Sequence, residues 1–204
     1  MNLPNKLTLF RVALIPVFVV LSLRLPGTIA GVFISIGLEE FVSAYDRFVD
    51  GAGYIAAGII FLTAFATDAL DGYIARKYKL VTDFGAFLDP IADKLLVTAA
   101  LVVLVVRGVI GAWIPIIIIS REFVVTGLRL LAANKGIVLA ADGFGKAKTA
   151  AQSVALTMLL FRNFNVSLLD SINAGGVLLY VAMVLTVFSG INYIVKNRGL
   201  FGTA

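Results

Sequence analysis

Long runs of apolar residues alternate along the chain with short polar segments. A helix needs about 20 apolar residues to cross the hydrocarbon layer of a bilayer. Six stretches have about this length or more: 7–25, 52–75, 84–106, 112–134, 146–162 and 172–195. The pattern predicts an all-α polytopic membrane protein with six transmembrane helices, folded as a single membrane-embedded domain over residues 1–204.

The first apolar stretch carries Lys6 and Arg11 near its start. Charged side chains favour the headgroup region, so the N-terminal segment is predicted to lie partly along the membrane surface before it turns inward. The stretch is too long for the apolar region of a signal peptide, and no convincing small-residue cleavage site follows it. We therefore interpret it as the first membrane helix.

Basic residues are distributed unequally over the two ends of the six stretches. Thirteen of the 17 lysines and arginines fall on the side of the N-terminus, and the other side has only Arg24, Arg47, Arg107 and Arg162. Cytoplasmic segments carry the excess of basic residues in membrane proteins. The asymmetry predicts that both termini are cytoplasmic and that 26–51 is an external loop, whose acidic residues we interpret as a solvated surface.

The composition narrows the possible chemistry. The 204 residues are 60% hydrophobic, with a mean hydropathy of +1.02 and no cysteine or histidine. Disulfides, thiolate metal sites and cysteine nucleophiles are excluded, and any metal must be bound by oxygen ligands, which suit hard cations such as Mg²⁺, Mn²⁺ or Ca²⁺. The net charge of +5 follows from the topology and does not indicate a nucleic-acid partner.

Four aspartates interrupt the second and third apolar stretches: Asp68, Asp71, Asp89 and Asp93. An acidic residue within a membrane span costs at least about 2.5 kcal/mol and indicates a functional site. Each pair, spaced by three or four residues, shares one helix face. Both pairs also lie at matching distances from the intervening loop, after which Thr82 or Asp83 is the expected N-cap. The four carboxylates are therefore predicted to converge near the cytoplasmic surface.

Four carboxylates in one pocket repel each other unless cations neutralise them. Two divalent cations balance four negative charges, and two-metal sites are a common device for phosphoryl displacement. Gly72, Ala75 and Gly85 leave room for a bulky substrate, and Arg76 offers a planar cation to a phosphate or a base. Structural ion pairs within the bundle, or a cation relay in a transporter, are the alternative interpretations.

The segment DALDGYIARKYKLVTDFGAFLDPIAD, residues 68–93, follows the pattern D-x2-D-G-x2-A-R-x8-G-x3-D-x3-D. It resembles the signature of the CDP-alcohol phosphatidyltransferases, and the resemblance extends over essentially the whole chain. It implies the fold of that family, usually a homodimer, with a cavity open to the cytoplasm and to lipid. It also implies transfer of a phosphatidyl group from CDP-diacylglycerol to an alcohol, in the bacterial cytoplasmic (inner) membrane.

The resemblance assigns roles to the signature residues. It implies that Asp68, Asp71 and Asp89 bind two divalent cations, Mg²⁺ or Mn²⁺, and that Asp93 completes the metal site and is the candidate general base. The CDP site is implied to include Asp68, Asp71, Gly72, Ala75, Arg76 and Gly85. The segments NLPNKLTLFRVALIP, SREFVVTGLRLLAANKG and FGKAKTAAQ resemble the branch of the family that uses glycerol 3-phosphate as acceptor.

Basic residues around the junction of the fourth and fifth stretches suit a dianionic acceptor phosphate. They are Arg121, Arg129, Lys146 and Lys148. Cytoplasmic ends of membrane helices are basic in any case, so these residues have an alternative explanation in topology. Polar residues of the first stretch are further candidates to close the substrate cavity: Asn5, Thr8 and Arg11.

Other functions compete with this interpretation. A family member that makes cardiolipin or phosphatidylserine shares the donor site and differs only in its acceptor. A membrane prenyltransferase also binds a diphosphate through aspartates and Mg²⁺, but its two motifs usually lie on well-separated helices. A cation transporter needs neither the glycines of the CDP site nor Arg76.

Overall fold

The computed structural model describes residues 3–78, 82–137, 143–161 and 173–198. Within these ranges the side chains of 69–76 and 143–147, and of a few single residues, are outside the description. The chain divides into two compact units, Met1–Arg107 and Gly108–Ala204.

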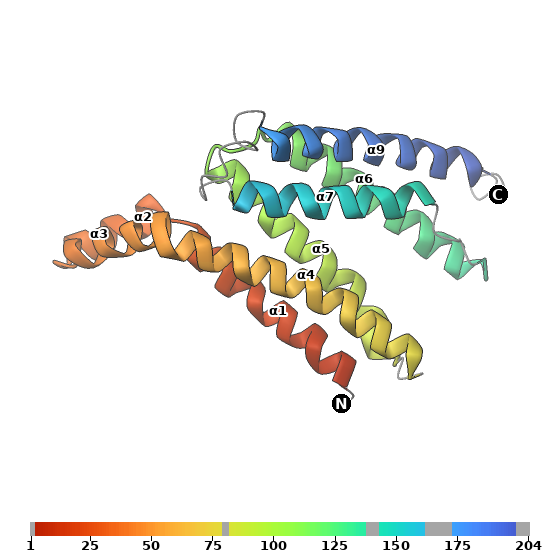
Figure 1. Ribbon diagram of the computed structural model, residues 1–204, viewed down its shortest axis with the longest axis horizontal. Helices are drawn as coiled ribbons and strands as arrows, with labels where there is room; N and C mark the ends of the chain where they lie inside the picture. The colour runs from red at the N-terminus through yellow and green to blue at the C-terminus, as the bar shows by residue number, and fades with distance from the viewer. Residues whose placement is uncertain (1–2, 79–81, 138–142, 162–172, 199–204) are drawn as a thin grey trace. The chain divides into compact units, whose positions relative to one another are not determined.

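The first unit is built around a long N-terminal helix, α1 (Leu3–Ser22). It continues through α2 (Gly27–Ser35), α3 (Glu39–Phe48), the short π-helix η1 (Val49–Gly53), α4 (Tyr54–Lys77) and α5 (Asp83–Val106). Helix α1 packs against both α4 and α5 (Figure 1). It is unbroken from Leu3 on, so the described residues contain no separate interfacial segment ahead of the first long helix.

Helix α5 begins with a side-chain cap. Thr82 has an extended backbone, with φ −120° and ψ 153°, and its hydroxyl accepts a hydrogen bond from the Gly85 amide at 3.1 Å. Such a cap satisfies one of the amides that the first helical turn leaves without a partner. Thr82 is thus the N-cap, one of the two candidates expected from the sequence.

Residues 26–51 were predicted to form an external loop. The segment is instead largely helical, so the prediction of a loop was wrong. Helix α2 is apolar and has no buried residue, and α3 continues through η1 into α4. The Tyr45 hydroxyl donates to the carbonyl oxygens of Val20 and Leu23, at 2.6 and 3.2 Å, which attaches α3 to the end of α1. Helix α2 is too short to cross a bilayer, and α3 belongs to a stretch of membrane-spanning length only together with η1 and α4, Glu39–Asp68.

The second unit consists, over its described part, of α6 (Trp113–Asn134), α7 (Gly143–Leu160) and α9 (Ala174–Lys196), with α9 packed against both other helices. Small residues allow α7 and α9 to approach closely. A Cβ atom on Gly175 would lie 3.1 Å from the Leu159 side chain, and Ala155 is completely buried.

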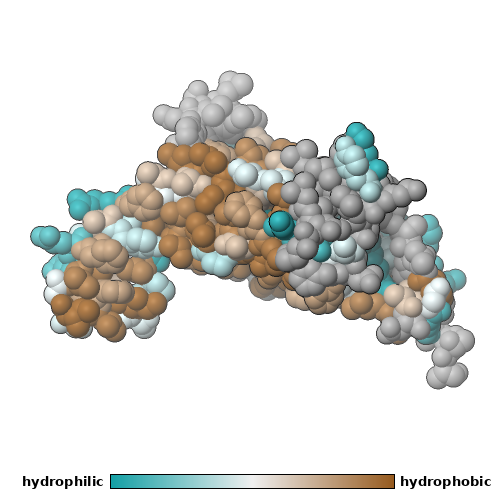
Figure 2. All heavy atoms as spheres, turned by 90° about the horizontal axis from the view of Figure 1, so that it is seen from below, coloured by the Kyte–Doolittle hydropathy of each residue, from teal (hydrophilic) through white to brown (hydrophobic). Residues whose placement is uncertain are grey.

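The six predicted membrane helices correspond to α1, α4, α5, α6, α7 and α9, but six crossings are not established. Within the described residues, three stretches are long and apolar enough to span a bilayer: Asn5–Ser22, Glu39–Asp68 and Ala174–Lys196. Charged residues of the candidate sites interrupt the apolar sequence of α5 and of α6. On the face drawn in Figure 2, hydrophobic side chains cover much of the described surface, as expected of a protein that contacts lipid tails.

Candidate active site

One face of α1 is polar although it is buried. Asn5, Thr8 and Arg11 follow each other at intervals of three residues, and they are 6%, 1% and 1% exposed. Residues at this spacing lie on the same side of a helix. Because α1 packs against α4 and α5, a buried polar face there must find its hydrogen-bonding partners on those two helices.

Two of the four aspartates supply those partners. The Arg11 guanidinium donates from Nη1 to Oδ1 of Asp68 in α4, at 2.5 Å, and the Thr8 hydroxyl donates to Oδ1 of Asp89 in α5, at 2.6 Å. Thr8 and Arg11 are three residues apart, about 4.5 Å along the helix axis. One short segment of α1 therefore binds one aspartate from each of the two pairs.

Gly85 lies where α1 meets the first turn of α5. The Thr82 hydroxyl that caps this turn donates to Oδ1 of Asn5 at 2.9 Å. A Cβ atom on Gly85 would lie 2.7 Å from that same oxygen, closer than real Cβ contacts. An alanine here would therefore force the Asn5 side chain to shift, so the packing of α1 against α5 favours glycine in addition to any role toward a substrate.

The donor chemistry of this region fits a hard divalent cation. Asp68 and Asp89 present carboxylate oxygens, the ligands that hard cations prefer, and Asp68 remains 39% exposed although its partner Arg11 is buried. Asp93 is half-buried in α5. Among the side chains that the structure describes, no three acidic residues come close enough to hold a metal. The side chains of Asp71, Gly72, Ala75 and Arg76 are outside the description.

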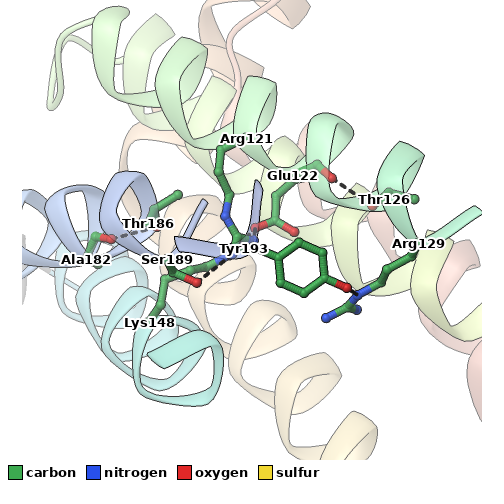
Figure 3. Close-up of polar contacts among 9 residues, drawn as sticks. All are labelled: Arg121, Glu122, Thr126, Arg129, Lys148, Ala182, Thr186, Ser189 and Tyr193. Atoms are coloured by element: carbon green, nitrogen blue, oxygen red, sulfur yellow. Dashed lines mark hydrogen bonds and ion pairs between the residues drawn. The ribbon is translucent and has the colours of Figure 1, made fainter. Parts of the chain in front are cut away.

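In the second unit, two of the predicted phosphate-binding cations share one carboxylate (Figure 3). Oε1 of Glu122 accepts a hydrogen bond from Nη1 of Arg121 at 3.1 Å and another from Nζ of Lys148. The side chains of Arg121 and Lys148 are only 13% and 6% exposed. The three groups together carry a net charge of +1, and Nε of Arg121 is buried without a partner among the described residues.

Helix α9 holds Arg121 from the other side. Nη2 of Arg121 donates to the Ser189 hydroxyl at 2.8 Å. A Cβ atom on Gly190 would lie 2.9 Å from Cγ of Arg121, so any larger residue there would displace the arginine side chain. Neither Ser189 nor Gly190 was expected from the sequence to belong to the site. The sequence does contain a clue to them: small or polar residues recur at intervals of three or four along this apolar helix, at 186, 189, 190 and 193.

Arg129 lies apart from this cluster. It is eight residues beyond Arg121 on α6, about 12 Å along the axis. Its Nε donates to the Tyr193 hydroxyl at 3.3 Å, and its guanidinium carbon is 5.6 Å from the Tyr193 ring centre. The side chain of Lys146, the fourth predicted cation, is outside the description. Of the four, the described structure brings together Arg121 and Lys148.

Comparison with known proteins gives the family. The sequence model of CDP-alcohol phosphatidyltransferases matches residues 1–188. A Bacillus subtilis protein named CDP-diacylglycerol–glycerol-3-phosphate 3-phosphatidyltransferase is 46% identical over 96% of this chain and 95% of its own length. A Haemophilus influenzae protein of the same name is 40% identical over 97% and 94%.

A more distant relative has a related name. A Mycobacterium tuberculosis protein named probable phosphatidylglycerophosphate synthase is 36% identical over 96% of this chain and 81% of its own length. The family's sequence signature lies within the matched region, and two of its aspartates meet on the buried polar face of α1. The chain belongs to the CDP-alcohol phosphatidyltransferase family.

Proposed function

We propose that this protein transfers the phosphatidyl group of CDP-diacylglycerol to glycerol 3-phosphate, forming phosphatidylglycerol phosphate and CMP. The acceptor is supported by the printed names of the relatives, which cover nearly the whole chain. The observation that carries the proposal is the convergence of Asp68 and Asp89 on Arg11 and Thr8. It joins the two halves of the signature, through aspartates that are 21 residues apart in sequence.

The aspartates form the donor site in this proposal. Asp68, Asp71, Asp89 and Asp93 would hold two divalent cations, Mg²⁺ or Mn²⁺, which would neutralise the diphosphate and make its phosphorus more electrophilic. Arg11 and Thr8 each bind Oδ1 of a carboxylate and so fix the rotamers of Asp68 and Asp89. Gly72, Ala75, Arg76 and Gly85 would bind the CDP moiety.

The reaction needs a base for the attacking alcohol. The primary hydroxyl of the acceptor loses its proton as its oxygen bonds to the phosphorus, and the bond from that phosphorus to the CMP oxygen breaks. The chain has no histidine, so a carboxylate beside the diphosphate is the natural acceptor for the proton. Asp93 takes this role.

The acceptor phosphate is assigned to the cations of the second unit. Lys148 is buried, Arg121 is only 13% exposed, and both donate to Glu122, so these three groups together carry a net positive charge that favours an anion. Arg129 and Lys146 complete the proposed set. A dianionic phosphate bound by such groups gains about 1.5–3 kcal/mol for each charged hydrogen bond. These contacts would favour glycerol 3-phosphate over glycerol, serine and inositol.

The cellular setting follows from the same interpretation. We place the protein in the bacterial cytoplasmic membrane as a homodimer whose chains each cross the bilayer six times. Both termini and the active site are on the cytoplasmic side in this arrangement. The excess of basic residues on the side of the N-terminus supports this orientation.

Labelled CDP-diacylglycerol tests the proposal directly. The purified protein with Mg²⁺ should convert it to phosphatidylglycerol phosphate only when glycerol 3-phosphate is present, and EDTA should stop the reaction until metal is restored. Asp68→Asn should abolish turnover, whereas Glu39→Gln, an exposed acid of α3, should not affect it. Preference for phosphatidylglycerol or serine would instead indicate cardiolipin or phosphatidylserine synthesis, and full activity in EDTA would exclude the metal mechanism.

A further inference from the structure

The first unit has a second polar site, at the ends of α1 and α5 that lie away from the aspartates. An open pocket of about 710 Å³ is lined there by Arg24, Asp50 and Arg107, the Ser22 to Pro26 segment and Val106. Pockets of this size hold small molecules or lipid headgroups.

Arg107 is held rigidly at the wall of this pocket. Its Nη1 donates to the Ser22 carbonyl oxygen at 2.7 Å, its Nη2 donates to Oδ1 of Asp50 at 3.4 Å, and its guanidinium carbon lies 4.0 Å from the Tyr54 ring centre. Only 17% of the side chain is exposed. A guanidinium fixed by several partners loses little conformational entropy when it binds a ligand.

Arg24 supplies the second cation. It donates to Oδ2 of Asp50 from Nε, at 3.0 Å, and from Nη2. The hydrogen bond to Asp50, and then the attraction between the two charges, raises the pKa of Arg24 above its ordinary value. Its side chain is 62% exposed, and a guanidinium has five N–H donors. Asp46, one turn before Asp50, also attracts Arg24, so the four groups balance in charge, and Arg24 offers an anion its exposed N–H donors rather than a surplus charge.

The position of the pocket indicates which anions are near it. Asp89 and Arg107 lie in and just beyond α5, 18 residues apart, which corresponds to about 27 Å along the helix. The hydrocarbon layer of a bilayer is about 30 Å thick. With α5 crossing the bilayer as in the proposed function, on which this step rests, the pocket lies near the membrane surface opposite to the aspartates, at the level of the headgroups of that leaflet.

We propose that this pocket binds the phosphate of an anionic phospholipid from the leaflet opposite to the aspartate site. Only four basic residues were expected on this side of the membrane, and two of them, Arg24 and Arg107, line this one pocket. Leu23, Leu25 and Val106 provide apolar walls, and the apolar helix α2 begins directly after Pro26. A lipid satisfies both the cations and these apolar walls, whereas free phosphate satisfies only the cations.

A fluorophore beside the pocket can test the proposal, because the chain has no native cysteine. Ala52 is exposed and two residues from Asp50, so Ala52→Cys labelled with bimane reports on lipid there. The full chain is reconstituted in neutral phosphatidylcholine vesicles with a nitroxide on either phosphatidylglycerol or phosphatidylcholine. We expect phosphatidylglycerol to associate about threefold more strongly, as one partly exposed charge contact allows.

Two matched variants locate the effect. Arg24→Gln should abolish the preference for phosphatidylglycerol, whereas Arg47→Gln should retain it, since Arg47 is also exposed but donates to the Ser43 carbonyl oxygen of its own helix. Equal quenching by both lipids in the unaltered background, or a preference that survives Arg24→Gln, would overturn the proposal. Loss of the preference in millimolar inorganic phosphate, but not in chloride of equal ionic strength, would show a phosphate site that is not specific for lipid.

Discussion

Gly85→Ala tests the packing of α1 against the signature. The added Cβ atom would lie 2.7 Å from Oδ1 of Asn5 and 3.2 Å from Oγ1 of Thr82. Asn5 must turn away and lose its hydrogen bond from Thr82, a loss of about 1 kcal/mol. Disturbance of the Thr82 cap adds about 1 kcal/mol. The better helix propensity of alanine offsets at most about 1 kcal/mol, so the free energy of unfolding should fall by about 1 kcal/mol.

A double-mutant cycle isolates the contact. In an Asn5→Ala background the obstructing oxygen is absent, so Gly85→Ala should be neutral or stabilise by up to about 1 kcal/mol. The coupling between the two positions should then be about 1–2 kcal/mol. The assay is equilibrium unfolding of the four purified proteins in mixed detergent, followed by circular dichroism. Additivity within about 0.5 kcal/mol would refute the contact between Asn5 and Gly85.

Turnover by the same four proteins separates two reasons for the glycine. If Gly85 is needed only because Asn5 approaches it, Gly85→Ala should regain turnover when Asn5 is also alanine, relative to Asn5→Ala alone. If the glycine also makes room for CDP-diacylglycerol, as its place in the signature implies, stability should return while turnover stays low. Recovery of both would remove Gly85 from the proposed CDP site.

Three further predictions concern the chemistry and the topology. Asp93→Asn should lower kcat by about 100-fold or more, and a near-normal kcat would exclude Asp93 as the base. Ser189→Ala should raise the KM for glycerol 3-phosphate by about tenfold, because Ser189 holds Arg121; a KM for CDP-diacylglycerol that rises equally would indicate general damage instead. Cysteines at Asp46 and Lys79 should react with an impermeant reagent from opposite sides of the membrane, and labelling from one side would contradict the predicted topology.

Local features explain what was predictable from the sequence. The six long helices were found close to their observed bounds because each is a long apolar run, and hydropathy depends only on neighbouring residues. Thr82 was a predictable cap because a threonine ahead of a helical stretch binds an amide of that same helix. The family was recognisable because its signature is one continuous segment, 68–93. The helices α2 and α3 were missed because both are too short for the length criterion.

Partners on different helices were decided by the tertiary structure. Arg11 was a candidate from the sequence, but its bond to Asp68 depends on how α1 is rotated against α4. The contact of Gly85 with Asn5 and that of Gly190 with Arg121 depend equally on where two helices cross. Helical periodicity states which residues share a face, but many pairs of faces can be packed together. The choice among them is made by side-chain packing over the whole interface, which no single stretch of sequence contains.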